Sequence, residues 1–232
     1  MREIAIGDIH GCIRSLNGLL ETIQPQKSDT LIFLGDYIDR GPDSYQVIET
    51  IIDLNKRCNV VALMGNHEQM LGWADANPES LMDWLRQGGN ATLDSYRNRG
   101  MLRGFAGIPE RHRHFIFEQT LAYWETDERI YVHASVEPET DLFEQTDLYL
   151  LWEKFRDPMV HKSGKQIICG HTSQKSGLPA IFKGGVCIDT WVYGNGWLTG
   201  FDTGAETFFQ TNERGGRRTF PLQKLVGAGD QI

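Results

Sequence analysis

TLIFLGDYIDRG, at residues 30–41, joins an apolar segment to a turn that carries two carboxylates and an arginine. The first five residues are rich in β-formers and predict a short buried strand. Apolar residues at helical spacing follow over residues 44–56 and predict a helix. Gly35 and Gly41 allow the backbone to turn sharply beside whatever the acidic side chains hold. In an α/β sheet, a carboxylate at the carboxyl end of a strand is well placed to bind a metal ion.

The same order of strand, polar turn and helix occurs twice more. Residues 2–6 predict a strand that ends in the turn GDIHG at residues 7–11, and an amphipathic helix follows it. Residues 60–63 predict a third strand, which ends in the turn GNHE at residues 65–68. Strands that alternate with helices indicate a mainly parallel sheet, and ligands of such sheets bind beyond the carboxyl ends of the strands. The three polar turns are therefore expected to converge on one site.

The second half of the chain is rich in predicted strands. Residues 121–125 and 129–132 predict a hairpin that ends at His133, and residues 166–169 predict a strand that ends just before His171. The other expectations are a strand at 186–188, closing antiparallel strands at 197–201 and 207–210, a solvated turn at 214–218 and a frayed tail from residue 227.

The residues between the two halves predict helices, which we interpret as a cap at about 68–118 on a single domain of residues 1–232. The tryptophans and methionines of this region include Trp73, Met82 and Trp84. We interpret them as helix core rather than as a platform for stacking bases.

Composition narrows the class of protein. The chain has 232 residues, of which 40% are hydrophobic and 23% charged, and this suits one globular domain with a sizeable core. A net charge of −8 disfavours a broad nucleic-acid surface. The four cysteines form no CxxC pair, which favours free thiols in a reducing compartment. No apolar run approaches the length that spans a bilayer, and no secretory segment is recognised, so we expect a cytoplasmic protein without a membrane partner.

Six side chains that can bind metals stand at the ends of predicted strands: Asp8, His10, Asp36, Asn66, His133 and His171. Carboxylate, imidazole and amide ligands without cysteine suit Mn²⁺, with Fe or Zn²⁺ as alternatives. Two metal ions that share a carboxylate are a usual arrangement for phosphoester hydrolysis. The remaining histidines, His112, His114 and His161, lie outside these turns and are expected to be ordinary surface residues.

The three motifs at residues 7–11, 35–41 and 65–68 resemble the signature of the phosphoprotein phosphatases, which belong to the calcineurin-like metallophosphoesterases. His133 and the pair Gly170-His171 follow in the matching order, and the segment IDTW at residues 188–191 is similar to the closing segment of the family. The family usually has glycine where this chain has Trp191. The resemblance implies an α/β fold in which a β-sandwich is flanked by helices, in four layers of order αββα.

The resemblance also implies roles for single residues. Asp8 and His10 would hold a first metal ion, Asp36 would bridge two, and Asn66, His133 and His171 would complete the second site. A metal-bridging hydroxide would attack phosphorus, and Asn66 would also contact the phosphate.

In the same resemblance, His67 would be the general acid, oriented by Asp39, and Arg40 would bind the phosphate. Bacterial members carry a second phosphate-binding arginine after a Leu-Trp pair, and here the pair at residues 151–152 is followed by Lys154 and Arg156. We favour Arg156, because lysine does not reproduce the two-pronged contact of a guanidinium.

These features predict a metal-dependent phosphoester hydrolase, first of all a serine/threonine protein phosphatase acting on phosphoproteins. The alternative is a symmetrical bis(5'-nucleosyl)-tetraphosphatase, which uses the same motifs on a dinucleotide and would differ in the helical cap and in the loop after His133. A second alternative is a catalytically inactive scaffold, which the complete ligand set disfavours. The sequence carries no signal for an oligomeric state.

Overall fold

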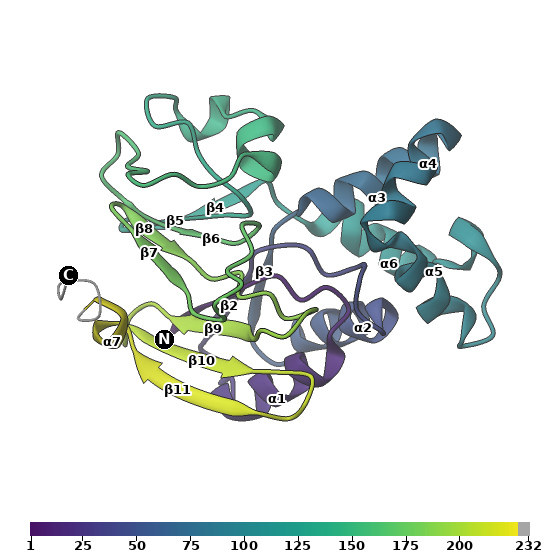
Figure 1. Ribbon diagram of the computed structural model, residues 1–232, viewed down its shortest axis with the longest axis horizontal. Helices are drawn as coiled ribbons and strands as arrows, with labels where there is room; N and C mark the ends of the chain where they lie inside the picture. Colours follow the sequence, from purple (N-terminus) through teal and green to yellow (C-terminus); the bar gives the residue numbers. More distant parts are fainter. Residues whose placement is uncertain (227–232) are drawn as a thin grey trace.

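The structure is a computed structural model, and it describes residues 1–226. Two β-sheets face each other, and helices flank them (Figure 1). The predicted α/β sandwich is therefore confirmed. The predicted frayed tail from residue 227 lies outside the described residues.

The first sheet has six strands in the order β11-β10-β9-β1-β2-β3. Its strands are β1 (Glu3–Ile6), β2 (Thr30–Phe33), β3 (Asn59–Ala62), β9 (Leu198–Asp202), β10 (Thr207–Thr211) and β11 (Arg217–Pro221). β1, β2 and β3 are parallel, with Glu3 opposite Thr30 and Thr30 opposite Asn59. The carboxyl ends of these three strands therefore lie along one edge, as the sequence predicts.

Two crossover helices, α1 (Ile13–Ile23) and α2 (Ser44–Leu54), connect the parallel strands. α1 buries Leu16, Leu19 and Ile23, whose spacing of three and four residues places them on one helix face. α2 begins after Asp43, whose side chain accepts a hydrogen bond from the amide of Gln46. These helices cover the outer face of the first sheet (Figure 1).

The second sheet has five strands in the order β4-β5-β6-β8-β7. They are β4 (Tyr123–Glu125), β5 (Arg129–Val132), β6 (Gln166–Cys169), β7 (Ala180–Phe182) and β8 (Gly185–Cys187). β5, β6 and β8 are parallel to one another, so the residues that follow β5 and β6 also lie at one edge.

A run of helices lies between β3 and β4 in the sequence and stands out to one side of the sheets (Figure 1). It comprises α3 (Asn66–Ala76), α4 (Pro78–Trp84), η1 (Leu85–Gly89), α5 (Asn90–Arg97), η2 (Gly104–Gly107), α6 (Glu110–His114) and η3 (Phe115–Gln119). The run matches the helical region expected at about 68–118, and its function as a cap stays a prediction.

Three apolar clusters define the layers. The first lies between the first sheet and the helices, and the second lies between the two sheets and contains Ile32, Tyr131 and Phe201. The third covers the outer face of the second sheet with residues such as Leu142 and Leu151. Within residues 1–226, two short helical turns, η4 (Leu142–Glu144) and η5 (Leu148–Trp152), contribute to that outer layer. The αββα order is present, but its fourth layer is made mainly of loops.

Two strands and one short helix depart from the expectations. β7 was not expected, and the basic segment predicted as a solvated turn instead enters β11 at Arg217. Arg218 lies over the ring of Trp197, with 4.3 Å between the guanidinium carbon and the ring centroid. This cation–π contact covers the arginine stem, so a basic residue is accommodated in a strand. The chain then continues into α7 (Gln223–Val226).

Candidate metal centre

The ends of β1, β2, β3, β5 and β6 bring five of the predicted site residues together. Two groups of potential metal ligands result, one of His10, Asp36 and His67 and one of Asp36, His133 and His171, and the ligand atoms in each group lie within 4.8 Å of one another. Asp36 belongs to both groups. All of these side chains except that of His171 are buried.

The carboxylate of Asp36 presents a different oxygen to each group. Its Oδ2 lies 3.4 Å from Nε2 of His10, whereas its Oδ1 lies 3.5 Å from Nε2 of His133. The amide oxygen of Asn66 lies 3.1 Å from Nε2 of His133 and 3.2 Å from Nδ1 of His171. The donor set therefore fits two cations that share one carboxylate, with Asn66 on the side of His133 and His171.

In three histidines, the ring nitrogen that points away from Asp36 and Asn66 donates a hydrogen bond to a backbone carbonyl. His10 donates from Nδ1 to Ile38 at 2.9 Å, His133 donates from Nδ1 to Leu34 at 2.8 Å, and His171 donates from Nε2 to Trp152 at 2.9 Å. A carbonyl only accepts, so the proton resides on the outward nitrogen and the inward nitrogen keeps its lone pair.

Two of these rings, those of His10 and His171, lie in surroundings that favour the neutral form. Burial lowers the pKa of His10 well below its usual value, and burial with the neighbouring His133 lowers the pKa of His171 to about 4. A metal ion requires this neutral form with a free lone pair.

His67 has a different environment from these ligands. Its Nδ1 donates to Oδ2 of Asp39 at 2.6 Å, and its Nε2 lies 4.0 Å from Oδ2 of Asp36. Burial by itself lowers the pKa of His67, but the charges of Asp36 and Asp39 outweigh it, so the pKa is raised. The ring is therefore suited to hold a proton on Nε2 and to donate it toward the centre.

Asp39 is held by two residues that the sequence does not connect with the site. Trp84 donates from Nε1 to its Oδ2 at 2.8 Å, and Thr92 donates from Oγ1 to its Oδ1 at 2.6 Å. Both partners come from the helical region, 45 and 53 residues away. No local pattern predicts such a pairing, because it depends on how the helices pack.

Glu68 is a third residue whose role the sequence did not reveal. Its buried carboxylate accepts hydrogen bonds from the amides of Asp36 (2.9 Å), Tyr37 (2.9 Å), Ile38 (3.3 Å) and Gly65 (3.0 Å). One side chain therefore connects the turn after β2 with the turn after β3. An acidic residue three positions after the glycine that precedes a helix is the available signal, since such a residue caps helix N-termini.

Backbone strain concentrates at this centre. Of the eight non-glycine residues with positive φ in residues 1–226, five are predicted site residues, namely His10, Asp36, Asp39, Arg40 and His171. Left-handed conformations of non-glycine residues cost about 1–3 kcal/mol each and persist where the surroundings enforce them.

Two glycines allow the turns at the ends of neighbouring strands to approach one another closely. A Cβ atom at Gly65 would lie 2.2 Å from Oδ1 of Asp36, and one at Gly170 would lie 2.2 Å from Oδ1 of Asp8. Any side chain at these positions would displace a predicted metal ligand. Asp8 itself is buried and accepts hydrogen bonds at 3.1 Å from the amide of His171.

Arg40 extends over the first group of ligands. One of its terminal nitrogens donates to Nε2 of His10 at 2.8 Å, and its guanidinium carbon lies 4.5 Å from the ring centroid of Tyr193. A phosphate oxygen can replace the imidazole as the partner of this guanidinium, because an arginine presents several donors at once.

The two candidates for a second phosphate-binding cation are not brought to the centre. Arg156 is 78% exposed and donates to Glu153 at 2.5 Å, and Lys154 is exposed. Their predicted contact with phosphate would require a movement of this loop, and it stays a prediction.

Two of the three remaining histidines are not surface residues, so that expectation is wrong for them. His112 contacts Tyr96 and Glu49, and His161 contacts Ser163 and the carbonyl of Thr140. Both are buried because neighbouring polar groups satisfy both ring nitrogens. His114 is 49% exposed, as expected.

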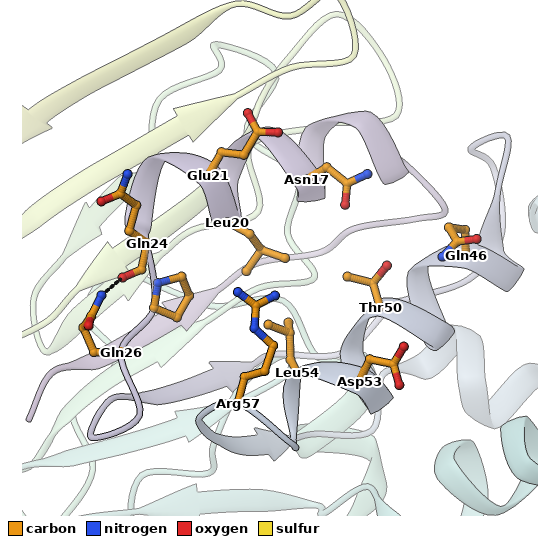
Figure 2. A pocket seen from close by; sticks show the side chains of 11 residues that line it. Asn17, Leu20, Glu21, Gln24, Gln26, Gln46, Thr50, Asp53, Leu54 and Arg57 are labelled. Carbon is orange, nitrogen blue, oxygen red and sulfur yellow. Dashed lines mark hydrogen bonds between the residues drawn. The ribbon is translucent and has the colours of Figure 1, made fainter.

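A cavity of about 720 Å³ lies apart from the predicted site residues, none of which lines it. It is formed by α1 and α2, and Figure 2 shows polar side chains such as Asn17, Gln46 and Arg57 around it. Nothing in it resembles the ligand geometry at the strand ends.

The family model described as "Calcineurin-like phosphoesterase" matches residues 1–208 of this sequence. The chain belongs to the calcineurin-like phosphoesterase family. The predicted family is therefore confirmed.

Curated relatives match shorter segments. A protein of Hamiltonella defensa named "Bis(5'-nucleosyl)-tetraphosphatase, symmetrical" is 37% identical over 38% of this chain and 38% of its own. "Serine/threonine-protein phosphatase 1" of Salmonella typhimurium is 40% identical over 37% of this chain and 38% of its own. Each match thus spans less than half of the relative's own length.

Solved structures confirm the fold. "Crystal structure of a putative diadenosine tetraphosphatase" superposes with a TM-score of 0.62 at 20% sequence identity, covering 95% of this chain and 93% of the other. Within residues 1–226, no helix combines the length and the apolar character that crossing a membrane requires.

The family resemblance also explains a feature of the closing segment. Trp191 has a φ of +63°, a conformation that favours glycine, which is the usual residue there in the family. The tryptophan is only partly buried, and its ring packs directly over Gly194. A Cβ at Gly194 would lie 2.3 Å from this ring, so the two positions depend on each other.

Proposed function

We propose that this phosphoesterase cleaves symmetrical dinucleoside polyphosphates at the centre formed by Asp36 and the surrounding histidines. The observation that carries the phosphoester chemistry is the contrast between the ring nitrogens. His10, His133 and His171 direct lone pairs inward, whereas His67 is bound to a carboxylate and favours the protonated form. Ligands and a proton donor therefore stand side by side.

Two divalent cations fit this donor set, and Mn²⁺ is the ion that we propose, with Fe or Zn²⁺ as alternatives. Asp8, His10 and Asp36 would hold one, and Asp36, Asn66, His133 and His171 would hold the other. When bound, such ions polarise phosphoryl oxygens and neutralise the charge that develops on them.

The other groups act on the phosphate and on the leaving oxygen. Arg40 would bind a non-bridging phosphate oxygen, and Asn66 would contact the same group. His67 would transfer the proton from Nε2 to the leaving oxygen, while Asp39 holds the ring and stabilises its positive charge. Trp84 and Thr92 keep the Asp39 carboxylate in place.

The choice of substrate is supported by the name of the Hamiltonella defensa relative, a symmetrical bis(5'-nucleosyl)-tetraphosphatase. The name of the Salmonella typhimurium relative supports a second candidate, a serine/threonine protein phosphatase. Both reactions use the same phosphate centre, so the parts of the substrate beyond the phosphate must separate them.

A parallel assay tests the proposal. The purified chain with Mn²⁺ is given diadenosine tetraphosphate, a phosphoserine peptide and p-nitrophenyl phosphate at equal concentrations, and products are quantified by chromatography. We expect ADP as the sole product of the dinucleotide, with the highest kcat/KM of the three substrates. A higher kcat/KM on the phosphopeptide would favour the phosphatase, and no turnover of any substrate would favour a scaffold.

A further inference from the structure

A small cavity lies directly beside the metal centre. It has a volume of about 320 Å³ and is lined by residues of α3, α4 and η1 together with Trp152. Pockets for small molecules usually measure about 300–1,000 Å³, so this one suits a single ring system rather than a whole dinucleotide.

The wall of this cavity is a pair of parallel tryptophans. The rings of Trp73 and Trp152 are inclined by only 3° and have centroids 5.6 Å apart. Trp73 is 48% exposed, so the expectation that it belongs to the helix core is wrong, whereas Trp84 is buried as expected. The half-exposed indole of Trp73, stacked on Trp152, offers flat apolar surface at the cavity.

The remaining lining residues supply polar groups at the edge. Ser80, Asp83, Arg86 and Gln87 line the cavity, and Arg86 donates to Asp83 at 2.8 Å. Donors and acceptors around a flat aromatic wall are what a nucleobase requires, since its faces stack and its edges form hydrogen bonds. A phenyl ring would leave these polar groups unused.

Two hydrogen bonds connect the cavity with the catalytic groups. The carbonyl of Trp152 accepts from Nε2 of His171 at 2.9 Å, and Nε1 of Trp84 donates to Asp39 at 2.8 Å. The residue after Gln87 is Gly88, whose carbonyl accepts from the amide of Arg40 at 3.2 Å. The cavity and the predicted phosphate centre are therefore separated by no more than the residues that form these hydrogen bonds.

From this juxtaposition we infer that the Trp73–Trp152 wall is a subsite for one nucleobase of a nucleoside polyphosphate whose phosphates occupy the metal centre. The inference rests on the proposed function, because it assigns a binding surface to the nucleoside of that substrate. It also explains how a phosphate centre common to two reactions can favour a nucleotide. The base stacks on the indole, and the polar edge contacts its heteroatoms.

The test compares ADP with inorganic pyrophosphate by titration calorimetry at matched free Mn²⁺. Both ligands carry a diphosphate group, and only ADP carries a ribose and a base. We expect ADP to bind about 5- to 100-fold more tightly, the range typical of base stacking on an aromatic side chain. Equal affinities in the unaltered protein would overturn the inference.

Variants at Trp73 assign the effect to the wall. Trp73→Ala should abolish the advantage of ADP over pyrophosphate, and Trp73→Phe should restore part of it because a flat ring is retained. Trp124→Ala is the matched control, since Trp124 is 38% exposed on β4 and does not line the cavity. It should preserve the advantage. Equal weakening of both ligands by Trp73→Ala would show a structural role for Trp73 and contradict the inference.

The binding test of the subsite and the hydrolysis test of the proposed function can fail independently. If diadenosine tetraphosphate is not hydrolysed but ADP retains an advantage that depends on Trp73, the subsite stands and the proposed substrate fails. If the dinucleotide is hydrolysed and ADP has no such advantage, the proposed substrate stands and the subsite fails.

Discussion

His67 with Asp39 and His112 with Glu49 form two histidine–carboxylate pairs at the same nitrogen–oxygen distance of 2.6 Å, and both histidines are buried. Only the first lies at the metal centre. Burial lowers the pKa of His112, and the Glu49 carboxylate does not compensate, whereas Asp36 and Asp39 together raise the pKa of His67 against burial. A short contact to a carboxylate therefore does not by itself make a proton donor.

The second ring nitrogen accounts for the difference. Nδ1 of His112 lies 2.9 Å from the hydroxyl of Tyr96, so both of its nitrogens are occupied by the protein. Nε2 of His67 faces the carboxylate of Asp36 at 4.0 Å and is directed into the ligand cluster. Glu49 is also shared with Arg111 at 2.9 Å, whereas Asp39 receives hydrogen bonds from two neutral donors. One pair connects α2 with α6, and the other contains the proposed proton donor.

The largest effect is expected for Asp36→Asn, which removes the charge that Nε2 of His67 faces. Both metal groups share this carboxylate, so we expect the Mn²⁺ content to fall at both sites from two ions per chain. Each ion supplies several kcal/mol, so kcat should fall by at least about 10⁴-fold. Elemental analysis and kcat on p-nitrophenyl phosphate measure these effects. Retention of one full site would mean that Asp36 does not bridge.

The second effect compares the two histidines directly. His67→Asn should lower kcat on a phosphoserine peptide by about 10²–10⁴-fold, the usual contribution of general acid catalysis, with unchanged metal content. The loss on p-nitrophenyl phosphate should be smaller, because that leaving group scarcely needs a proton. His112→Asn should leave both rates unchanged. Equal losses of His67→Asn on the two substrates would rule out its role as the leaving-group acid.

A smaller effect is expected when the supporting donors are removed. Trp84→Phe deletes the hydrogen bond to Asp39 and should lower kcat on the phosphoserine peptide by about 3- to 10-fold, a fraction of the value of a charge-assisted bond. Tyr96→Phe deletes the corresponding partner of His112 and should change only stability. An unchanged kcat in Trp84→Phe would show that this tryptophan does not support the acid.

The smallest effect is a pH dependence of stability with opposite sign at the two histidines. The folded pKa of His112 is lowered, so the unfolded chain binds more protons below about pH 6.5, and His112 reduces the free energy of unfolding as pH falls through that range. The folded pKa of His67 is raised, so its stabilisation is complete below about pH 6.5 and is lost as pH rises through the raised value.

Urea denaturation of the metal-free chain at several pH values measures both contributions. The difference in unfolding free energy between the unaltered chain and His112→Asn should shrink as pH falls below about 6.5. The difference for His67→Asn should grow as pH falls toward 6.5. The same sign for both variants would contradict the comparison.

Local sequence patterns predicted the structure best where turn residues and metal-binding types of side chain occur together. The turns at residues 7–11, 35–41 and 65–68 follow strands and contain glycine with ligand-type side chains, and these local features predict both the parallel strands and the convergence of the ligands. The family, the two sheets and their flanking helices are confirmed on this basis. The roles of single residues in metal binding and catalysis stay predictions.

Sequence reasoning failed where a residue's environment depends on distant segments. His112 is buried because Glu49, 63 residues away, accepts a hydrogen bond from its Nε2. No local sequence pattern predicts that contact. Trp73 and Trp84 lie 11 positions apart in similar helical sequence, yet one is exposed and the other buried.

By itself, the sequence determined which groups can bind metal ions and at which strand ends they stand, because periodicity and turn chemistry act over a few residues. Only the tertiary structure decided which nitrogen of each histidine faces inward, that Glu68 connects two turns and that Trp84 and Thr92 hold Asp39. Hydrogen bonds between residues 19 to 99 positions apart set these features. They form only after the helices and sheets pack, so no short stretch of sequence encodes them.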